Sequence, residues 1–148
     1  DTNSLNKLWD DFKNGNCEEI ENYLNKTLDN TISIFDTKSH DEKKEYAYHM
    51  FLTGVLSTNP NWIVKSNLES GDGFADLIIE IDHYDSGIVV EIKHSLTYDG
   101  LNDSCLEAIN QIKDKRYDTY LRNEGRNNIL IYGIAFCKKR CKVVVEKL

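Results

Sequence analysis

The sequence has few features that would break it into parts or tie it to a membrane. It contains one proline and no glycine- or serine-rich tract, so we expect a single domain over residues 1–148. No apolar stretch approaches the roughly 18 residues that a membrane span needs, and no signal-peptide pattern opens the chain. We expect a cytoplasmic protein without a membrane partner. The chain begins with Asp1 rather than Met, and we expect it to be cut from a longer protein.

Cysteine and histidine are too scattered for a zinc site. The four cysteines are Cys17, Cys105, Cys137 and Cys141, and no CxxC or Cys/His cluster occurs. We therefore expect reduced thiols, and oxygen rather than sulfur donors at any metal site.

Positive charge is scarce overall but concentrated near the end of the chain. The sequence has 18 basic and 25 acidic residues, a net charge of −7, which argues against a nucleic-acid partner. Residues 109–148, however, carry ten Lys or Arg against four acids, a balance of +6, which leaves −13 for residues 1–108. A basic final third is typical of an interaction surface, but a solvated helix face gives the same count.

The order of predicted elements indicates an α/β fold. A helical scaffold over residues 1–38 precedes a core over residues 39–148. Short turns make three strands antiparallel neighbours, and the helix before the fourth strand indicates a crossover to a parallel partner. We expect a mixed sheet flanked by helices. The predicted elements are helices over 3–13, from 17 onward, over 39–57 and over 104–122, an extended segment over 31–38, and strands over 62–68, 74–81, 87–93, 129–135 and 142–146.

Three helix starts are predicted from capping motifs. Segments 16–19, 39–42 and 104–107 each have the spacing of a capping box. On the helix over 39–57, the helical spacing of apolar residues predicts the face that packs on the sheet. The residues of that face are Ala47, Met50, Phe51, Gly54 and Val55.

Ionisable residues interrupt two of the apolar strands. Strand alternation sends Asp76 to one face of its strand, and Glu91 and Lys93 to one face of the next. In a hairpin centred between His83 and Tyr84, Asp76 is directly opposite Glu91, and Lys93 is one diagonal step away. Two carboxylates and an amine then converge on one spot.

The spacing leaves two alternatives open. A turn centred on residues 85–86 would move Asp76 opposite Ser95. Alternatively, Asp76 ends a turn, and Lys93 simply neutralises Glu91 on an exposed stripe. Taken alone, the spacing favours this second interpretation.

Directly opposed carboxylates repel each other, and a divalent cation would remove that repulsion. Oxygen donors favour Mg²⁺ or Mn²⁺, which bind through one or two carboxylates and substrate phosphates. The implied substrate is a phosphate ester. Lys93 would orient or help deprotonate a water and offset charge on the phosphoryl oxygens.

Four stretches of the sequence, in order, carry a resemblance. With Asp76 after a glycine-rich turn and Glu45 on the preceding helix, they resemble the PD-(D/E)XK nuclease superfamily. More narrowly, they are similar to the nuclease-like domain behind an AAA-type ATPase-like region in bacterial proteins. The match runs from about Leu8 to the end of the chain. The stretches are Ser66-Asn67-x-Glu69-Ser70-Gly71-Asp72-Gly73, Val90-Glu91-Ile92-Lys93, Ala108-Ile109-x-Gln111-Ile112 and Tyr132-Gly133-Ile134-Ala135.

The resemblance implies a restriction-endonuclease-like core and a metal-dependent phosphodiesterase. It implies Asp76 and Glu91 as metal ligands, with Glu45 completing the metal shell. It implies Lys93 as the catalytic lysine and Gln111 as the glutamine beside it.

The chain also departs from the family pattern. Ala75 stands where the superfamily name has proline, which affects the turn rather than the ligands. Residues 94–97 follow the lysine where a different loop is expected, so no substrate contacts are carried over to them. Lys115 and Tyr117 extend the helix motif, although tyrosine at this position is more often a core residue.

We predict a Mg²⁺- or Mn²⁺-dependent nuclease that hydrolyses DNA, with RNA less favoured, by metal-activated water. The basic final third would contact phosphates without reading sequence. The residues expected to do so are Lys113, Lys115, Arg116, Arg122, Lys138, Lys139 and Arg140.

Two other functions stay open. The same fold can serve as a non-catalytic docking or nucleic-acid-binding module. Its partner would then be an ATPase-like region of the parent chain or a second copy in a homodimer. A hydrolase of small phosphate esters would share the metal centre and ignore the basic third.

Overall fold

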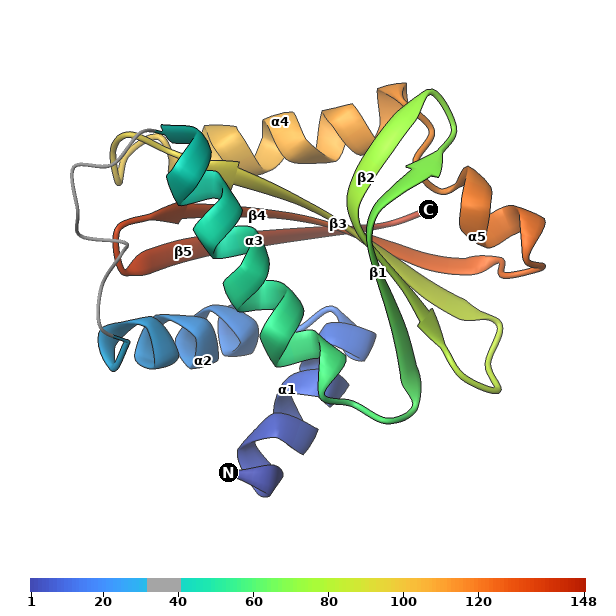
Figure 1. Cartoon of the computed structure of the whole chain (residues 1–148), viewed down its shortest axis with the longest axis horizontal. Helices are drawn as coiled ribbons and strands as arrows, with labels where there is room; N and C mark the ends of the chain where they lie inside the picture. Colours follow the sequence, from blue (N-terminus) through green and yellow to red (C-terminus); the bar gives the residue numbers. More distant parts are fainter. Residues whose placement is uncertain (32–40) are drawn as a thin grey trace.

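The computed structural model describes residues 1–31 and 41–148, together with the side chains of all of these but 41 and 42. A five-stranded mixed sheet lies between two layers of helices (Figure 1). This arrangement confirms the predicted α/β fold and is consistent with a restriction-endonuclease-like core. None of the described helices is both long and apolar enough to cross a bilayer.

The strands are arranged in the sheet in their sequence order. The first three form the predicted antiparallel meander, β3 and β4 are parallel, and β4 and β5 form an antiparallel hairpin. The parallel pair follows from the helix between β3 and β4, because a crossover is needed to bring the chain back in the same direction. The strands are β1 Trp62–Ser70, β2 Gly73–Ile81, β3 Ser86–His94, β4 Asn128–Cys137 and β5 Arg140–Lys147.

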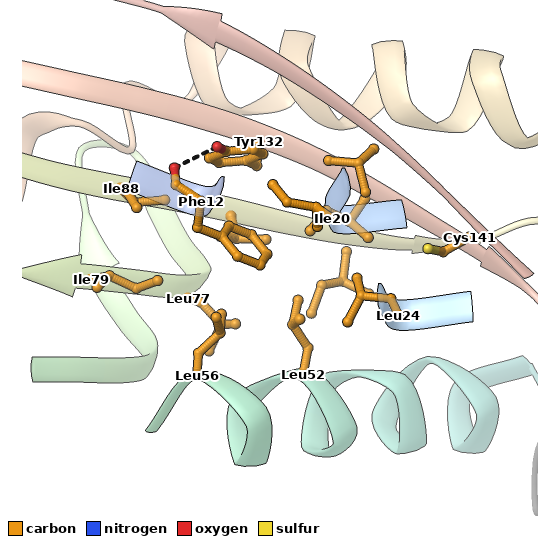
Figure 2. Close-up of a cluster of buried hydrophobic side chains, with 14 of the residues drawn as sticks. Phe12, Ile20, Leu24, Leu52, Leu56, Leu77, Ile79, Ile88, Tyr132 and Cys141 are labelled. Carbon is orange, nitrogen blue, oxygen red and sulfur yellow. Dashed lines mark hydrogen bonds between the residues drawn. The ribbon is translucent and has the colours of Figure 1, made fainter. Parts of the chain in front are cut away.

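The helices cover both faces of the sheet. On one face, α1 Thr2–Asn14, α2 Cys17–Asp29 and α3 Asp41–Ser57 enclose the larger core. Figure 2 shows this core, where the hydroxyl of Tyr132 also donates to the carbonyl of Phe12 at 2.6 Å. On the other face, α4 Leu101–Asp114 and α5 Thr119–Asn123 enclose a second, smaller core.

The buried face of α3 matches the predicted one in part, since Ala47, Phe51 and Val55 are half-buried and pack against the larger core. Met50 is 51% exposed and Gly54 is also exposed, whereas Tyr48, Leu52 and Leu56 are fully buried. The prediction was incomplete because apolar residues occur all around this helix, so their periodicity does not single out one stripe. The capping box at 39–42 and nearly all of the extended segment at 31–38 lie outside the described residues.

Two other capping predictions were wrong. Helix α2 begins after Asn16 as expected, but the Asn16 side chain donates to Asp11 Oδ1 at 3.0 Å rather than capping the helix. Helix α4 begins at Leu101, before the Ser104 motif, because the tight turn at Gly100 already starts the helix. The predicted helix to residue 122 is also interrupted between α4 and α5.

Candidate functional site

Strands β2 and β3 part at the residues predicted to form the site. Their backbone pairing runs from Glu80 opposite Gly87 to Leu77 opposite Val90, and it stops before Asp76. Beyond this point β2 stays paired with β1, whereas β3 continues along β4. The observed register is the one that places Asp76 opposite Glu91, so the alternative turn centred on residues 85–86 is wrong.

The two carboxylates bridge the place where the strands part. The backbone N–H of Asp76 donates to Glu91 Oε1 at 2.8 Å, and the backbone N–H of Ile92 donates to Asp76 Oδ2 at 2.8 Å. Each side chain thus accepts an amide hydrogen from the opposite strand. Because these amides hold both carboxylates in place, the pair is fixed by the backbone itself.

The β1–β2 hairpin changes its orientation at the same position. Val64 and Leu77 pack in the larger core, whereas Leu68 and Ala75 pack in the smaller core on the opposite face. Regular alternation would keep Val64 with Leu68, and Ala75 with Leu77, on one face. The register is unchanged on both sides, so backbone rotation rather than an inserted residue reverses the alternation.

Asn67 lies at the centre of this reversal. It falls between the pairs Ser66–Leu77 and Leu68–Ala75, and therefore opposite Asp76. Its φ of 52° is in the left-handed region, which asparagine tolerates better than most residues. The backbone reversal at Asn67 lies directly across from Asp76, whose amide donates to Glu91. Sequence reasoning missed this role, although an asparagine within a strand is a signal for such a conformation.

The carboxylate pair is electrostatically unfavourable without a cation. Glu91 is only 3% exposed, and its pKa is raised to about 8, mainly by burial and also by the neighbouring Asp76 carboxylate. The amide of Asp76 and the ammonium of Lys93 act in the opposite direction. A site with this charge takes up either a proton or a metal cation. Its all-oxygen donor set fits Mg²⁺ or Mn²⁺.

Lys93 is held beside the pair by Gln111 of helix α4, which is in turn held by Tyr117. Its Nζ donates to Gln111 Oε1 at 2.6 Å, and Gln111 Nε2 donates to the hydroxyl of Tyr117 at 3.2 Å. Tyr117 is buried in the smaller core. The tyrosine therefore serves in the core, as predicted, and also orients Gln111. Gly73 leaves room for it, because a Cβ there would lie 3.2 Å from the tyrosine hydroxyl.

The tip of the β1–β2 hairpin is clamped to the turn between α4 and α5. The Asp72 carboxylate receives hydrogen bonds from the Arg116 guanidinium at 2.9 and 3.1 Å, which lower the pKa of Asp72. The Asp72 amide donates to the carbonyl of Lys115 at 2.8 Å. Ser70 Oγ donates to the carbonyl of Tyr117 at 2.7 Å. These contacts fix β2 where it has left β3.

Among the described residues, Glu45 does not form a group of three carboxylates with Asp76 and Glu91. It is exposed on α3, and within residues 1–31 and 41–148 no three His, Cys, Asp or Glu side chains gather in a way that could hold a metal. The ligand role of Glu45 therefore stays a prediction, with a two-carboxylate site at Asp76 and Glu91 as the observed arrangement.

Most of the predicted phosphate-binding residues take part in ion pairs. The pairs are Lys113 with Glu146 at 2.6 Å, Arg116 with Asp72 at 2.9 Å, Arg122 with Asp118 at 2.6 Å and Arg140 with Asp29 at 2.9 Å. The excess of positive charge in the final third is thus largely matched by nearby acids. Lys115 and Lys138 are exposed, and Lys139 is half-buried. Phosphate binding by these seven residues stays a prediction.

Comparison with known proteins agrees with this geometry. A family model described as the PD-(D/E)XK nuclease superfamily matches residues 43–146, which include helices α4 and α5 and all of the sheet except the last residue of β5. None of the curated proteins and none of the solved structures compared matches the chain significantly.

Proposed function

We propose that this chain, which belongs to the PD-(D/E)XK nuclease superfamily, is a Mg²⁺- or Mn²⁺-dependent nuclease that hydrolyses phosphodiester bonds. The observation that carries the proposal is the amide-bridged pair of Asp76 and Glu91 at the point where two strands part, with Lys93 next along β3. DNA is favoured over RNA as the substrate.

Each of the three residues has a separate task. Asp76 and Glu91 would hold the cation, since their oxygens are preoriented by backbone amides and the buried pair needs a positive charge. The bound ion would polarise the phosphate and lower the pKa of an attacking water. Lys93 would orient this water and offset charge that develops on the phosphoryl oxygens.

Gln111 is a positioning residue in this proposal. Lys93 has a flexible side chain with several rotamers, and the short hydrogen bond to Gln111 selects one of them. Gln111 is itself held by the buried Tyr117. The ammonium group is therefore already in position before the reaction, which lowers the entropic part of the activation barrier.

Cleavage of supercoiled plasmid and of labelled oligonucleotides tests the proposal. Wild-type protein should cut with Mn²⁺ or Mg²⁺ and stop with chelator. Asp76→Asn and Lys93→Ala should each lose at least about 100-fold in rate. Asp10→Asn and Lys147→Ala change the same residue types at exposed sites away from the pair and should cut normally. Full activity of Asp76→Asn or Lys93→Ala would contradict the proposal.

One observation favours a second candidate, a non-catalytic docking module. The chain has a net charge of −7, and four of the seven predicted phosphate contacts are already paired with acids. Its partner would be an ATPase-like region of a parent chain or a second copy. Calorimetry with Mn²⁺ separates the candidates: the nuclease binds the ion in a way that Glu91→Ala abolishes, whereas a docking module needs no ion.

A further inference from the structure

The loop after Lys93 exposes two large apolar side chains. Leu96 is 77% exposed and Tyr98 is 53% exposed, close together between the end of β3 and the start of α4. Exposed apolar residues in a cluster commonly mark a binding surface. Nothing in the catalytic proposal uses these two side chains.

Hydrogen bonds hold this loop in one conformation, and in that conformation Leu96 and Tyr98 are exposed. The amide of Ser95 donates to the carbonyl of Phe136 at 2.8 Å and extends the β3–β4 ladder by one residue. Ser95 Oγ donates to the carbonyl of Thr97 at 2.7 Å. Thr97 Oγ1 in turn receives the amide of Gly100 at 3.1 Å. Gly100 is needed for this closeness, because a Cβ there would lie 2.7 Å from Ser95 Oγ.

The loop and the β4–β5 turn line an open pocket of about 310 Å³. Cys137 is a buried part of its wall, and Lys138 lies across from Tyr98, with Nζ 5.9 Å from the centre of the ring. The backbone of Lys138 is fixed as well, since its carbonyl accepts the hydroxyl of the fully buried Tyr48 at 2.9 Å. The lining residues are Leu96, Thr97, Tyr98, Asp99, Cys137 and Lys138.

The lysine and the tyrosine of this pocket suit a ligand that has both a phosphate and a flat aromatic part. Lys138 is the one base among the lining residues, and its Nζ faces the Tyr98 ring. Asp99 is the one acid among the lining residues. A nucleotide has the matching chemistry, because its base stacks on an aromatic ring and its phosphate pairs with lysine.

The pocket also lies close to the proposed catalytic lysine. Leu96 follows Lys93 by three residues, and an extended chain of this length spans at most about 10 Å. A strand of nucleic acid at Lys93 would therefore reach the pocket within a few nucleotides.

We propose that this pocket binds an unpaired base of the substrate, stacked on Tyr98 against Leu96, with a neighbouring phosphate on Lys138. The inference rests on the proposed nuclease function and narrows its substrate to single-stranded or locally opened nucleic acid. A base inside a duplex has both faces covered by its neighbours, so only an unstacked base can lie on Tyr98.

Binding of a fluorescent single-stranded DNA oligonucleotide, measured by anisotropy with chelator present to prevent cutting, tests the inference. Tyr98→Ala should raise the Kd about 5- to 100-fold, which is the range found for loss of one base-stacking aromatic. Tyr98→Phe keeps the ring and should bind as wild type does. A duplex of the same length should bind more weakly than the single strand and respond little to Tyr98→Ala.

Tyr84→Ala is the matched control. Tyr84 is 59% exposed and also has a lysine over its ring, with Lys13 Nζ at 4.3 Å from the ring centre. It lies in the turn between β2 and β3, at the end of β3 away from Lys93. Its substitution should leave the Kd unchanged.

The inference is overturned if Tyr98→Ala binds single-stranded DNA as tightly as wild type does. It is also overturned if Tyr84→Ala raises the Kd as much as Tyr98→Ala does, or if the wild-type protein binds no single strand. Cutting assays separate it from the proposed function. Binding through Tyr98 without any Mn²⁺-dependent cutting would reject the nuclease and keep the base pocket. Cutting with a KM for single strands that Tyr98→Ala leaves unchanged would reject the pocket and keep the nuclease.

Discussion

The backbone amide of Asp76 donates a hydrogen bond to the carboxylate of Glu91, and the amide of Ile92, the residue after Glu91, donates to the carboxylate of Asp76. In a regular ladder these amides would donate to backbone carbonyls. Here the side chains replace the carbonyls at the point where the strands part. The same two hydrogen bonds thus end the β2–β3 pairing and hold two carboxylates together, which links the split in the sheet directly to the proposed metal site.

The buried Glu91 should make the metal-free protein less stable as the pH rises. Its pKa in the folded protein is about 8, against an ordinary value of 4.5, so folding favours the protonated form. The stability that the protonated Glu91 contributes to the free energy of unfolding is fully present below pH 4.5 and is lost as the pH rises to about 8. Glu91→Gln removes this titration and keeps an oxygen for the Asp76 amide.

Thermal unfolding in chelator measures this effect as the difference in Tm between Glu91→Gln and wild type. The variant should gain several degrees relative to wild type at pH 8 and much less at pH 5. Comparing the two proteins at each pH cancels the titration of groups that do not interact with Glu91. A difference in Tm that does not change between these pH values would contradict the assignment of the raised pKa to Glu91.

Gln111 should affect the rate of cutting and leave metal binding intact. Gln111→Leu removes the hydrogen bond that holds Lys93 Nζ, and we expect kcat to fall about 10- to 100-fold, since misplacing a catalytic group by about 1 Å has a cost of this size. Mn²⁺ affinity, measured by calorimetry, should match wild type. Tyr117→Phe, which removes only the hydroxyl behind Gln111, should give a smaller loss. A Gln111→Leu enzyme with wild-type kcat would show that Lys93 needs no such support.

Asn67 should tolerate glycine and resist a β-branched residue. Its φ of 52° is strained for valine, so Asn67→Val should lower the free energy of unfolding by about 1–3 kcal/mol, whereas Asn67→Gly should stay near wild type. Urea denaturation measures both. Glu69→Val, at an exposed position of the same strand with no positive φ, is the control and should have little effect. Equal stability of Asn67→Val and Glu69→Val would argue against a strained backbone at Asn67.

The sheet was predictable because its signals are local. Turn-rich segments separate strands of alternating or apolar character, and short turns leave antiparallel pairing as the main solution. The pairing of Asp76 with Glu91 followed from one assumption about the centre of the turn, which the register confirms. Helix α3 was harder because apolar residues surround it, and only packing on the sheet selects Tyr48, Leu52 and Leu56 as its buried face.

The parts of the site that escaped prediction depend on contacts far apart in the sequence. The pairing of basic residues with acids, such as Arg140 with Asp29, joins segments 111 residues apart. The reversal at Asn67 needs both cores to be known. The family resemblance supplied Gln111, whereas its link to Tyr117 required the structure.

The clamp on the β1–β2 hairpin gives a stability test with a built-in control. Gly71 and Gly125 both have a positive φ, of 60° and 83°, so alanine should be strained at either position. At Gly71 an added Cβ would also overlap the carbonyl oxygens of Lys115 and Arg116, whereas at Gly125 it would meet nothing within 4 Å. We therefore expect Gly125→Ala to lower the free energy of unfolding by about 1 kcal/mol and Gly71→Ala to lower it clearly more.

Since the clamp holds β2 beside the carboxylate pair, Gly71→Ala should also weaken Mn²⁺ binding, which calorimetry can detect in the fraction that remains folded. Equal losses of stability in the two variants would mean that the hairpin tip does not rest closely on the turn between α4 and α5.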